Sequence, residues 1–167
     1  MSRRHIPCWL FGILSGGLSG EIAILWPRLP QRMGTHFGTS GEPNGWSTSS
    51  QFLILVAAVL GIFMVLFTMA DWLDRVPDRF LNLPNRDYWL AADRRAAALA
   101  TLRDWLRWFL MITFPALVVL MSAMLQANLF EAPHLSISPL IAIAGLMLPQ
   151  VIMIAWLNRH FRVPRDA

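Results

Sequence analysis

The sequence predicts an all-α integral membrane bundle of four transmembrane helices, with both termini in the cytoplasm and a cytoplasmic amphipathic helix before the third span. Three observations lead to this fold class. The chain of 167 residues is 56% hydrophobic and only 14% charged, a balance far from that of a soluble domain. Its apolar residues gather in runs of about 20, the length of helix that crosses a ~30 Å hydrocarbon core. Most of its basic residues lie before the first run, between the second and third runs, or after the fourth.

The four predicted spans cover residues 7–26, 51–70, 105–127 and 137–157. The first follows two arginines, as a signal peptide would, but its apolar character continues to Trp26, so we expect an uncleaved anchor. The fourth contains Pro149 and Gln150 near its centre, where a missing amide and a polar side chain predict a kink packed against protein. Since no repeat or polar linker divides the chain, we expect residues 1–167 to form a single membrane domain.

The distribution of arginine predicts the orientation. All 14 basic side chains are arginine, and only Arg28 and Arg32 fall in the first loop. The others lie before the first span, around the second loop and in the tail: Arg3, Arg4, Arg75, Arg79, Arg86, Arg94, Arg95, Arg103, Arg107, Arg159, Arg162 and Arg165. The positive-inside rule places these three regions in the cytoplasm. Contact with the lipid bilayer then accounts for the basic balance, and no nucleic-acid partner is expected.

The second loop predicts an amphipathic helix that leads into the third span. Over residues 88–107 an apolar face recurs at helical spacing, and charged side chains lie largely opposite. One interpretation is a helix that lies along the inner membrane surface. The other is a docking surface for a cytoplasmic protein partner, because arginine and aromatic residues are good interface anchors.

The first outer loop, residues 29–46, holds the first candidate site. Pro43-Asn44-Gly45 predicts a tight turn. His36 and Glu42 have the chemistry of a metal-binding or acid/base pair, because a neutral imidazole and a carboxylate are competent ligands. The alternative is that His36 and Trp46 pack at headgroup level while Glu42 hydrogen-bonds loop amides.

The same loop resembles a known family. Residues 29–46 follow the pattern Leu-Pro-x4-Thr-His-Phe-x2-Ser-Gly-Glu-Pro-x-Gly-Trp, which is similar to the signature of a bacterial membrane domain of unknown function that also occurs at the start of SdpI-type toxin-immunity proteins. Residues 83–89 followed by Arg94-Arg95 are similar to what comes after that domain in relatives. The resemblance implies a bacterial inner-membrane protein, with toxin immunity and sensing as the role described for relatives.

The first span holds the second candidate site, at Glu21. An intramembrane carboxylate is by default a functional hypothesis, and a ligand here would be a cation, a proton or a peptide group. Polar companions are expected around the third loop, namely Gln126, Asn128, Glu131 and His134. The alternative is a carboxylate that reaches the interface or pairs with Arg28 or Arg32.

Three classes of function follow from these features. The leading hypothesis is a nonenzymatic membrane protein: the zinc, nucleophile-elbow and phosphate-loop motifs are absent from the sequence and no cofactor is implied. Its relation to the SdpI type is what the resemblance of residues 29–46 implies. A second is a subunit for ion or small-solute transport through Glu21 and the break at Pro149. A third is a structural subunit of a membrane complex, since Gly12, Gly16 and Gly20 share one helical face and permit close helix approach.

Overall fold

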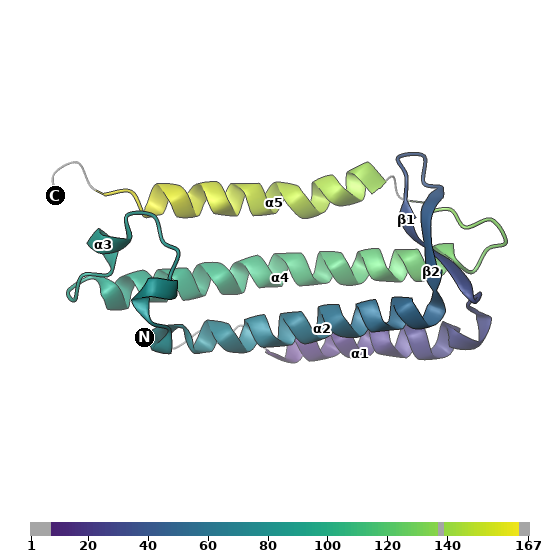
Figure 1. The fold of residues 1–167 in the computed structure, drawn as a ribbon, viewed down its shortest axis with the longest axis horizontal. Coiled ribbons are helices and arrows are strands. Elements are labelled where there is room, and N and C mark those ends of the chain that lie inside the picture. Colours follow the sequence, from purple (N-terminus) through teal and green to yellow (C-terminus); the bar gives the residue numbers. More distant parts are fainter. Residues whose placement is uncertain (1–7, 137–138, 164–167) are drawn as a thin grey trace.

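Four long helices lie side by side in the computed structural model, which describes residues 8–136 and 139–163 (Figure 1). They are α1 (Cys8–Leu25), α2 (Ser49–Asp71), α4 (Arg95–Ala127) and α5 (Pro139–His160). Three stretches, Trp9–Arg28, Ser49–Asp71 and Arg95–Ala127, are long and apolar enough to cross a membrane. The predicted mostly helical fold is therefore confirmed, with three helices that could span a membrane. The predicted starts of the first and fourth spans, residues 7 and 137, lie outside the described residues.

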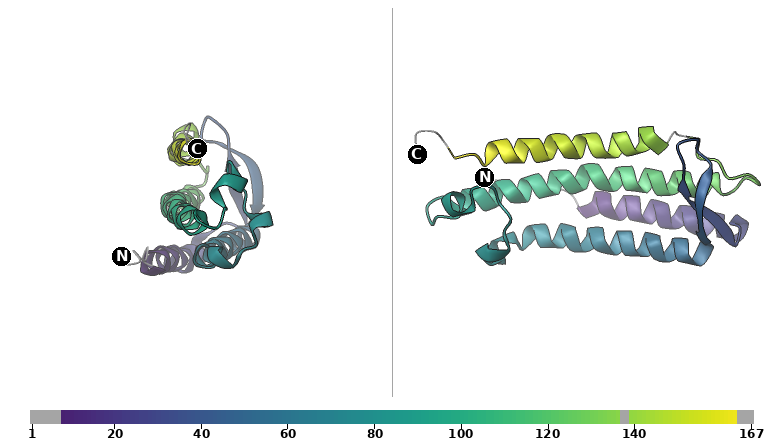
Figure 2. Two further views of the ribbon diagram at one scale, coloured as in Figure 1. Left: turned by 90° about the vertical axis from the view of Figure 1, so that its left-hand side faces the viewer. Right: turned by 45° about the horizontal axis from the view of Figure 1, so that its top comes forward.

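Helix α4 is the centre of the bundle. Viewed along the helices, it lies between α5 on one side and the pair α1 and α2 on the other (Figure 2). Toward the end that carries the hairpin, Leu18, Phe52 and Leu125 from the three neighbouring helices form one buried cluster. Farther along, Phe63 and Phe114 form another, with ring centroids 5.0 Å apart. Apolar packing against α4 thus fixes α1 and α2.

The amphipathic segment before the third predicted span is not a separate helix. A short helix α3 (Arg86–Trp89) is followed by a break, after which α4 runs without interruption from Arg95 to Ala127. The apolar face of this first part of α4 packs on protein, because Ala98 is buried against Leu83 and Phe161. That surface is therefore covered by protein, and the segment belongs to the same helix as the predicted span over residues 105–127, as expected for a helix that leads into the third span.

Ion pairs join this end of α4 to the last residue of α2 and to the segment that follows it. That segment contains two 3-10 helices, η2 (Leu73–Arg75) and η3 (Asp78–Phe80). Arg107 pairs with Asp71, Arg103 pairs with Asp74, and Arg95 Nη2 lies 2.9 Å from Asp78 Oδ1. Acidic and basic side chains at this end of the bundle thus pair with one another.

The motif at residues 83–89 caps the C-terminal end of α5. Asn85 Nδ2 and Trp89 Nε1 donate to the backbone oxygen of Phe161, at 2.8 and 2.9 Å. Asn85 has φ +52°, a left-handed conformation that asparagine tolerates better than most residues. Because the last carbonyls of a helix lack partners within it, the two donors satisfy one acceptor that α5 leaves open.

A polar contact joins α4 and α5 midway along the bundle. Gln150 Nε2 donates to Thr113 Oγ1 over 2.5 Å, and the Gln150 side chain is buried. The expectation that this polar side chain packs against protein is therefore confirmed. Its Oε1 atom has no hydrogen-bond donor among the described residues.

Candidate functional site

The loop at residues 29–46 folds into a β-hairpin, an element that the all-α prediction did not include. Strands β1 (Arg32–Phe37) and β2 (Pro43–Thr48) pair antiparallel. The predicted turn at Pro43-Asn44-Gly45 is wrong, because these residues belong to β2. The chain reverses instead between Gly38 and Glu42, where Gly38 donates to the Glu42 backbone oxygen and Gly41 donates to that of Gly38. Gly41 has φ +86°, which suits glycine and strains other residues.

Buried contacts fix the hairpin to the loop after α4. Asn128 Oδ1 accepts from the Gly34 backbone N at 2.6 Å, and Asn128 Nδ2 donates to the Gly34 backbone O at 2.9 Å. The Asn128 side chain is only 2% exposed. Beside the turn, the Leu135 backbone N donates to Gly41 O at 2.9 Å. The hairpin therefore has a defined position on the bundle.

Close contacts explain why side chains are excluded at two hairpin positions. A Cβ atom at Gly41 would lie 2.8 Å from both His134 Cε1 and the Leu135 backbone O, and one at Gly45 would lie 2.8 Å from His36 Cβ. Either contact would force the hairpin or its neighbour to move. The glycines of the loop signature thus set the fit of the hairpin, which the sequence alone did not reveal.

The other face of the hairpin presents polar and aromatic side chains to the surroundings. Trp46 is 43% exposed, and the Arg32 guanidinium lies 4.9 Å from its ring centroid. His36 is exposed, and its Nδ1 atom is hydrogen-bonded to Asn44 Oδ1. Glu42 is exposed at the end of the turn. These contacts place His36, Glu42 and Trp46 on one small element.

No metal centre is formed by the hairpin in this arrangement. Within residues 8–136 and 139–163, no group of three or more His, Cys, Asp or Glu side chains is placed to hold a metal ion. His36 bonds to Asn44, and no hydrogen bond joins it to Glu42 in the described part of the chain.

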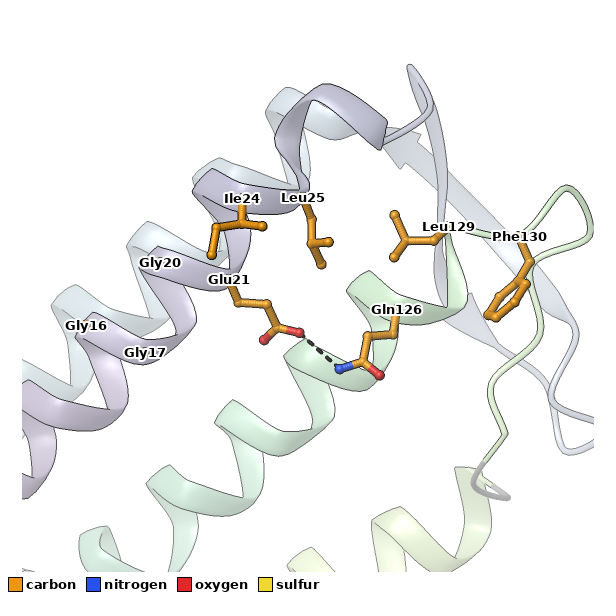
Figure 3. Close-up of a pocket in the computed structure, with 9 residues that line it drawn as sticks. All are labelled: Gly16, Gly17, Gly20, Glu21, Ile24, Leu25, Gln126, Leu129 and Phe130. Carbon is orange, nitrogen blue, oxygen red and sulfur yellow. Dashed lines mark hydrogen bonds between the residues drawn. The ribbon is translucent and has the colours of Figure 1, made fainter.

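The second candidate, Glu21, contacts α4. Ser122 Oγ donates to Glu21 Oε1 at 2.9 Å, and Gln126 Nε2 donates to the same oxygen at 3.0 Å (Figure 3). The predicted companion Gln126 is thus present, while Ser122 was missed because a serine in an apolar helix gives no distinct signal.

The other predicted partners of Glu21 lie elsewhere. Asn128 and His134 contact the hairpin, as described above, and Glu131 is exposed. Arg32 lies over Trp46, and none of the ion pairs in the described residues includes Glu21. The carboxylate therefore has two neutral donors.

An open cavity of about 680 Å³ lies beside Glu21, between α1 and α4 at the end of the bundle that carries the hairpin. Figure 3 shows the residues that line it: Gly16, Gly17, Gly20, Glu21, Ile24, Leu25, Gln126, Leu129 and Phe130. A Cβ atom at Gly12, Gly16 or Gly20 would meet nothing within 4 Å. The glycine face expected to pack against a helix is thus open within this chain.

The fold and its apolar helices define a class: a helical membrane protein with an anchored β-hairpin at one end. Residues 21–62 match the family described as Domain of unknown function (DUF1648). The match runs from Glu21 through the hairpin into α2, so it contains all four predicted site residues. No curated protein and no solved structure matches the chain.

Proposed function

We propose that the chain is a nonenzymatic, multi-pass protein of a bacterial inner membrane, related to SdpI-type immunity and sensing proteins, that recognises a partner through the outer hairpin. The observation that carries this proposal is the contact between the exposed side chains of Trp46 and Arg32 on the hairpin. The buried side chain of Asn128 fixes this hairpin by a hydrogen bond to the Gly34 backbone. Tryptophan and arginine are among the residues enriched at energetically dominant interface positions. A pre-positioned surface also loses little conformational entropy on binding.

The proposed topology has four spans, with the hairpin outside and both termini in the cytoplasm. Helix α5 has 22 residues, about 33 Å at 1.5 Å per residue, which is enough to cross the hydrocarbon core beside α4. Most arginines lie at the end that carries α3, opposite the hairpin (Figure 1). The positive-inside rule assigns that end to the cytoplasm.

Cysteine labelling tests this topology. In a Cys8→Ser background, we expect a membrane-impermeant thiol reagent to label the exposed Ser40→Cys variant in intact cells. The exposed Asp93→Cys variant should react only after the membrane is opened. Labelling of Asp93→Cys in intact cells, or protection of Ser40→Cys, would contradict the proposed orientation.

Recognition through the hairpin is tested by affinity purification from native membranes in mild detergent. We compare the intact protein with Trp46→Ala and with Trp26→Ala, a matched control whose tryptophan is 41% exposed near the same end of the bundle. A specific protein recovered with the intact chain and Trp26→Ala, but lost with Trp46→Ala, supports the proposal. Equal recovery with all three variants contradicts it.

The polar groups of the bundle favour recognition over transport. Ser122 and Gln126 face Glu21, whereas Thr113 faces Gln150 on α5. Thr113 and Ser122 are nine residues apart, which places them on opposite sides of α4 at about 100° per residue. The two polar clusters of the described residues therefore do not join into one path.

A further inference from the structure

The cavity beside Glu21 combines a carboxylate with apolar walls. Its floor is formed by Gly16, Gly17 and Gly20, and its walls include Ile24, Leu25, Leu129 and Phe130. Its volume is about 680 Å³, and it is open to the surroundings rather than enclosed. Apart from Glu21 and Gln126, the lining side chains offer an apolar surface. A ligand that fits this lining is an amphiphile.

The charge of Glu21 indicates which headgroup the amphiphile carries. Both donors, Ser122 and Gln126, are neutral and contact the same oxygen, Oε1. Figure 3 shows the other oxygen directed away from Gln126. No ion pair of the described residues compensates the carboxylate charge. Because an uncompensated charge near hydrocarbon is costly, a cationic group on the ligand would be stabilised here.

The position of Glu21 along α1 selects a lipid. Glu21 lies four residues before Leu25, the last residue of α1, so it is about 6 Å below the end of the helix at 1.5 Å per residue. In the proposed orientation this is close to the boundary between headgroups and acyl chains of the outer leaflet. A headgroup bound at Glu21 would leave its acyl chain free to run along the glycine floor.

We propose that this cavity binds a phospholipid whose headgroup carries a primary ammonium. The ammonium donates hydrogen bonds to the Glu21 carboxylate, and part of one acyl chain covers Gly16, Gly17 and Gly20. A quaternary ammonium fits less well, because it has no N–H to donate and Phe130 is the sole aromatic side chain in the lining. A second copy of the chain fits less well too, since it would bring another Glu21 carboxylate toward the first. The proposal does not depend on recognition through the hairpin.

Native mass spectrometry of the purified full chain, titrated with lipids of identical acyl chains, tests the proposal. We expect phosphatidylethanolamine to bind about tenfold more tightly than phosphatidylglycerol or phosphatidylcholine, a difference of about 1.4 kcal/mol. Glu21→Gln should reduce phosphatidylethanolamine affinity to the level of phosphatidylglycerol. This variant keeps an oxygen for Ser122 and Gln126, so the contact between α1 and α4 is preserved. Glu131→Gln, which removes an exposed carboxylate outside the cavity lining, should change nothing.

Two further measurements test whether the acyl chain is needed for binding and whether a free headgroup can replace the lipid. Gly17→Leu places a side chain in open space and should weaken phosphatidylethanolamine binding by filling the floor while Glu21 stays in place. Soluble phosphoethanolamine should fail to displace the lipid at equal concentration. The proposal is overturned if the parent protein binds all three lipids equally, or if Glu21→Gln and Glu131→Gln have equal effects. Displacement by phosphoethanolamine at equal concentration, or unaltered binding to Gly17→Leu, would also overturn it.

Discussion

Replacement of Asn128 by alanine should release the hairpin from the bundle while the helices stay folded. Asn128 makes two tertiary hydrogen bonds to Gly34, at 2.6 and 2.9 Å, and a third to the Met124 backbone O one turn earlier in α4, at 2.8 Å. Alanine would leave the N–H and the carbonyl of Gly34, a buried residue, without these partners. A lost buried hydrogen bond that leaves its partner unsatisfied costs about 1–3 kcal/mol.

The expected cost of local opening follows from these two bonds. Two buried groups lose their partners, and water that enters at this end of the bundle offsets part of the penalty, so we expect about 2–4 kcal/mol. At about 1.4 kcal/mol per factor of ten, the population of the open hairpin should rise about 30- to 700-fold. Hydrogen exchange of peptides covering β1 and β2, followed by mass spectrometry, measures this rise directly.

A matched control separates the hairpin contact from the bond within the helix. Asn158 also donates from Nδ2 to the backbone oxygen four residues earlier, Ile154 O, at 3.0 Å, and its side chain makes no other hydrogen bond in the described part of the chain. Asn158→Ala should therefore leave hairpin exchange unchanged. If Asn128→Ala raises exchange in the hairpin less than threefold, or raises it equally in α2, Asn128 is not the anchor that the geometry indicates.

Two smaller changes probe the turn of the hairpin and the cap of α5. Gly41→Ala should lower the stability of the hairpin by about 1–3 kcal/mol, because it combines a positive φ with a Cβ contact of 2.8 Å; hydrogen exchange of the hairpin measures the loss. Trp89→Phe should speed exchange at the C-terminal end of α5 about fivefold, because it removes one hydrogen bond, worth about 1 kcal/mol, to Phe161 O.

Each of these changes has a control elsewhere in the chain. At Gly38 φ is not positive and the nearest atom to a Cβ would lie at 3.5 Å, so Gly38→Ala should have little effect on the hairpin. Trp72 is exposed and donates no side-chain hydrogen bond in the described structure, so Trp72→Phe should leave α5 unchanged. Equal effects within either pair would show that general loss of packing, rather than the stated contact, is responsible.

The membrane class was predictable because it depends on composition and length. The runs over residues 51–70 and 105–127 can be recognised from hydropathy alone. The first of them agrees closely with α2, which spans Ser49–Asp71. The capping box at the start of α2, in which the Thr48 side chain accepts from Gln51 N, could have been read from spacing as well. Local signals of this kind carry enough information on their own.

The hairpin was harder to predict because long-range contacts hold it. Pro43-Asn44-Gly45 has favourable turn residues, and their place in β2 is decided by pairing with β1 and by contacts of the turn with His134 and Leu135, more than 90 residues away. Asn128 was expected near Glu21, since both are polar and lie near the same end of the bundle. Sequence distance and polarity alone cannot say which of two neighbouring segments a buried amide will contact.

A distance measurement tests whether the first part of α4 continues straight into the bundle or lies along the membrane surface, two arrangements that the sequence did not distinguish. One straight helix from Arg95 to Ala127 separates Ala97 and Val119, which are 22 residues apart, by about 33 Å at 1.5 Å per residue. A surface helix that turned by 90° at residue 105 would give legs of about 12 and 21 Å, and a separation of about 24 Å. Both positions are exposed, so spin labels on cysteines introduced there in a Cys8→Ser background should report the longer distance by electron–electron resonance. A distance near 24 Å in lipid would show that the first part of α4 leaves the bundle and lies on the membrane. That result would also separate Ala98 from Leu83 and Phe161, and the cap on α5 would lose the surface that supports it.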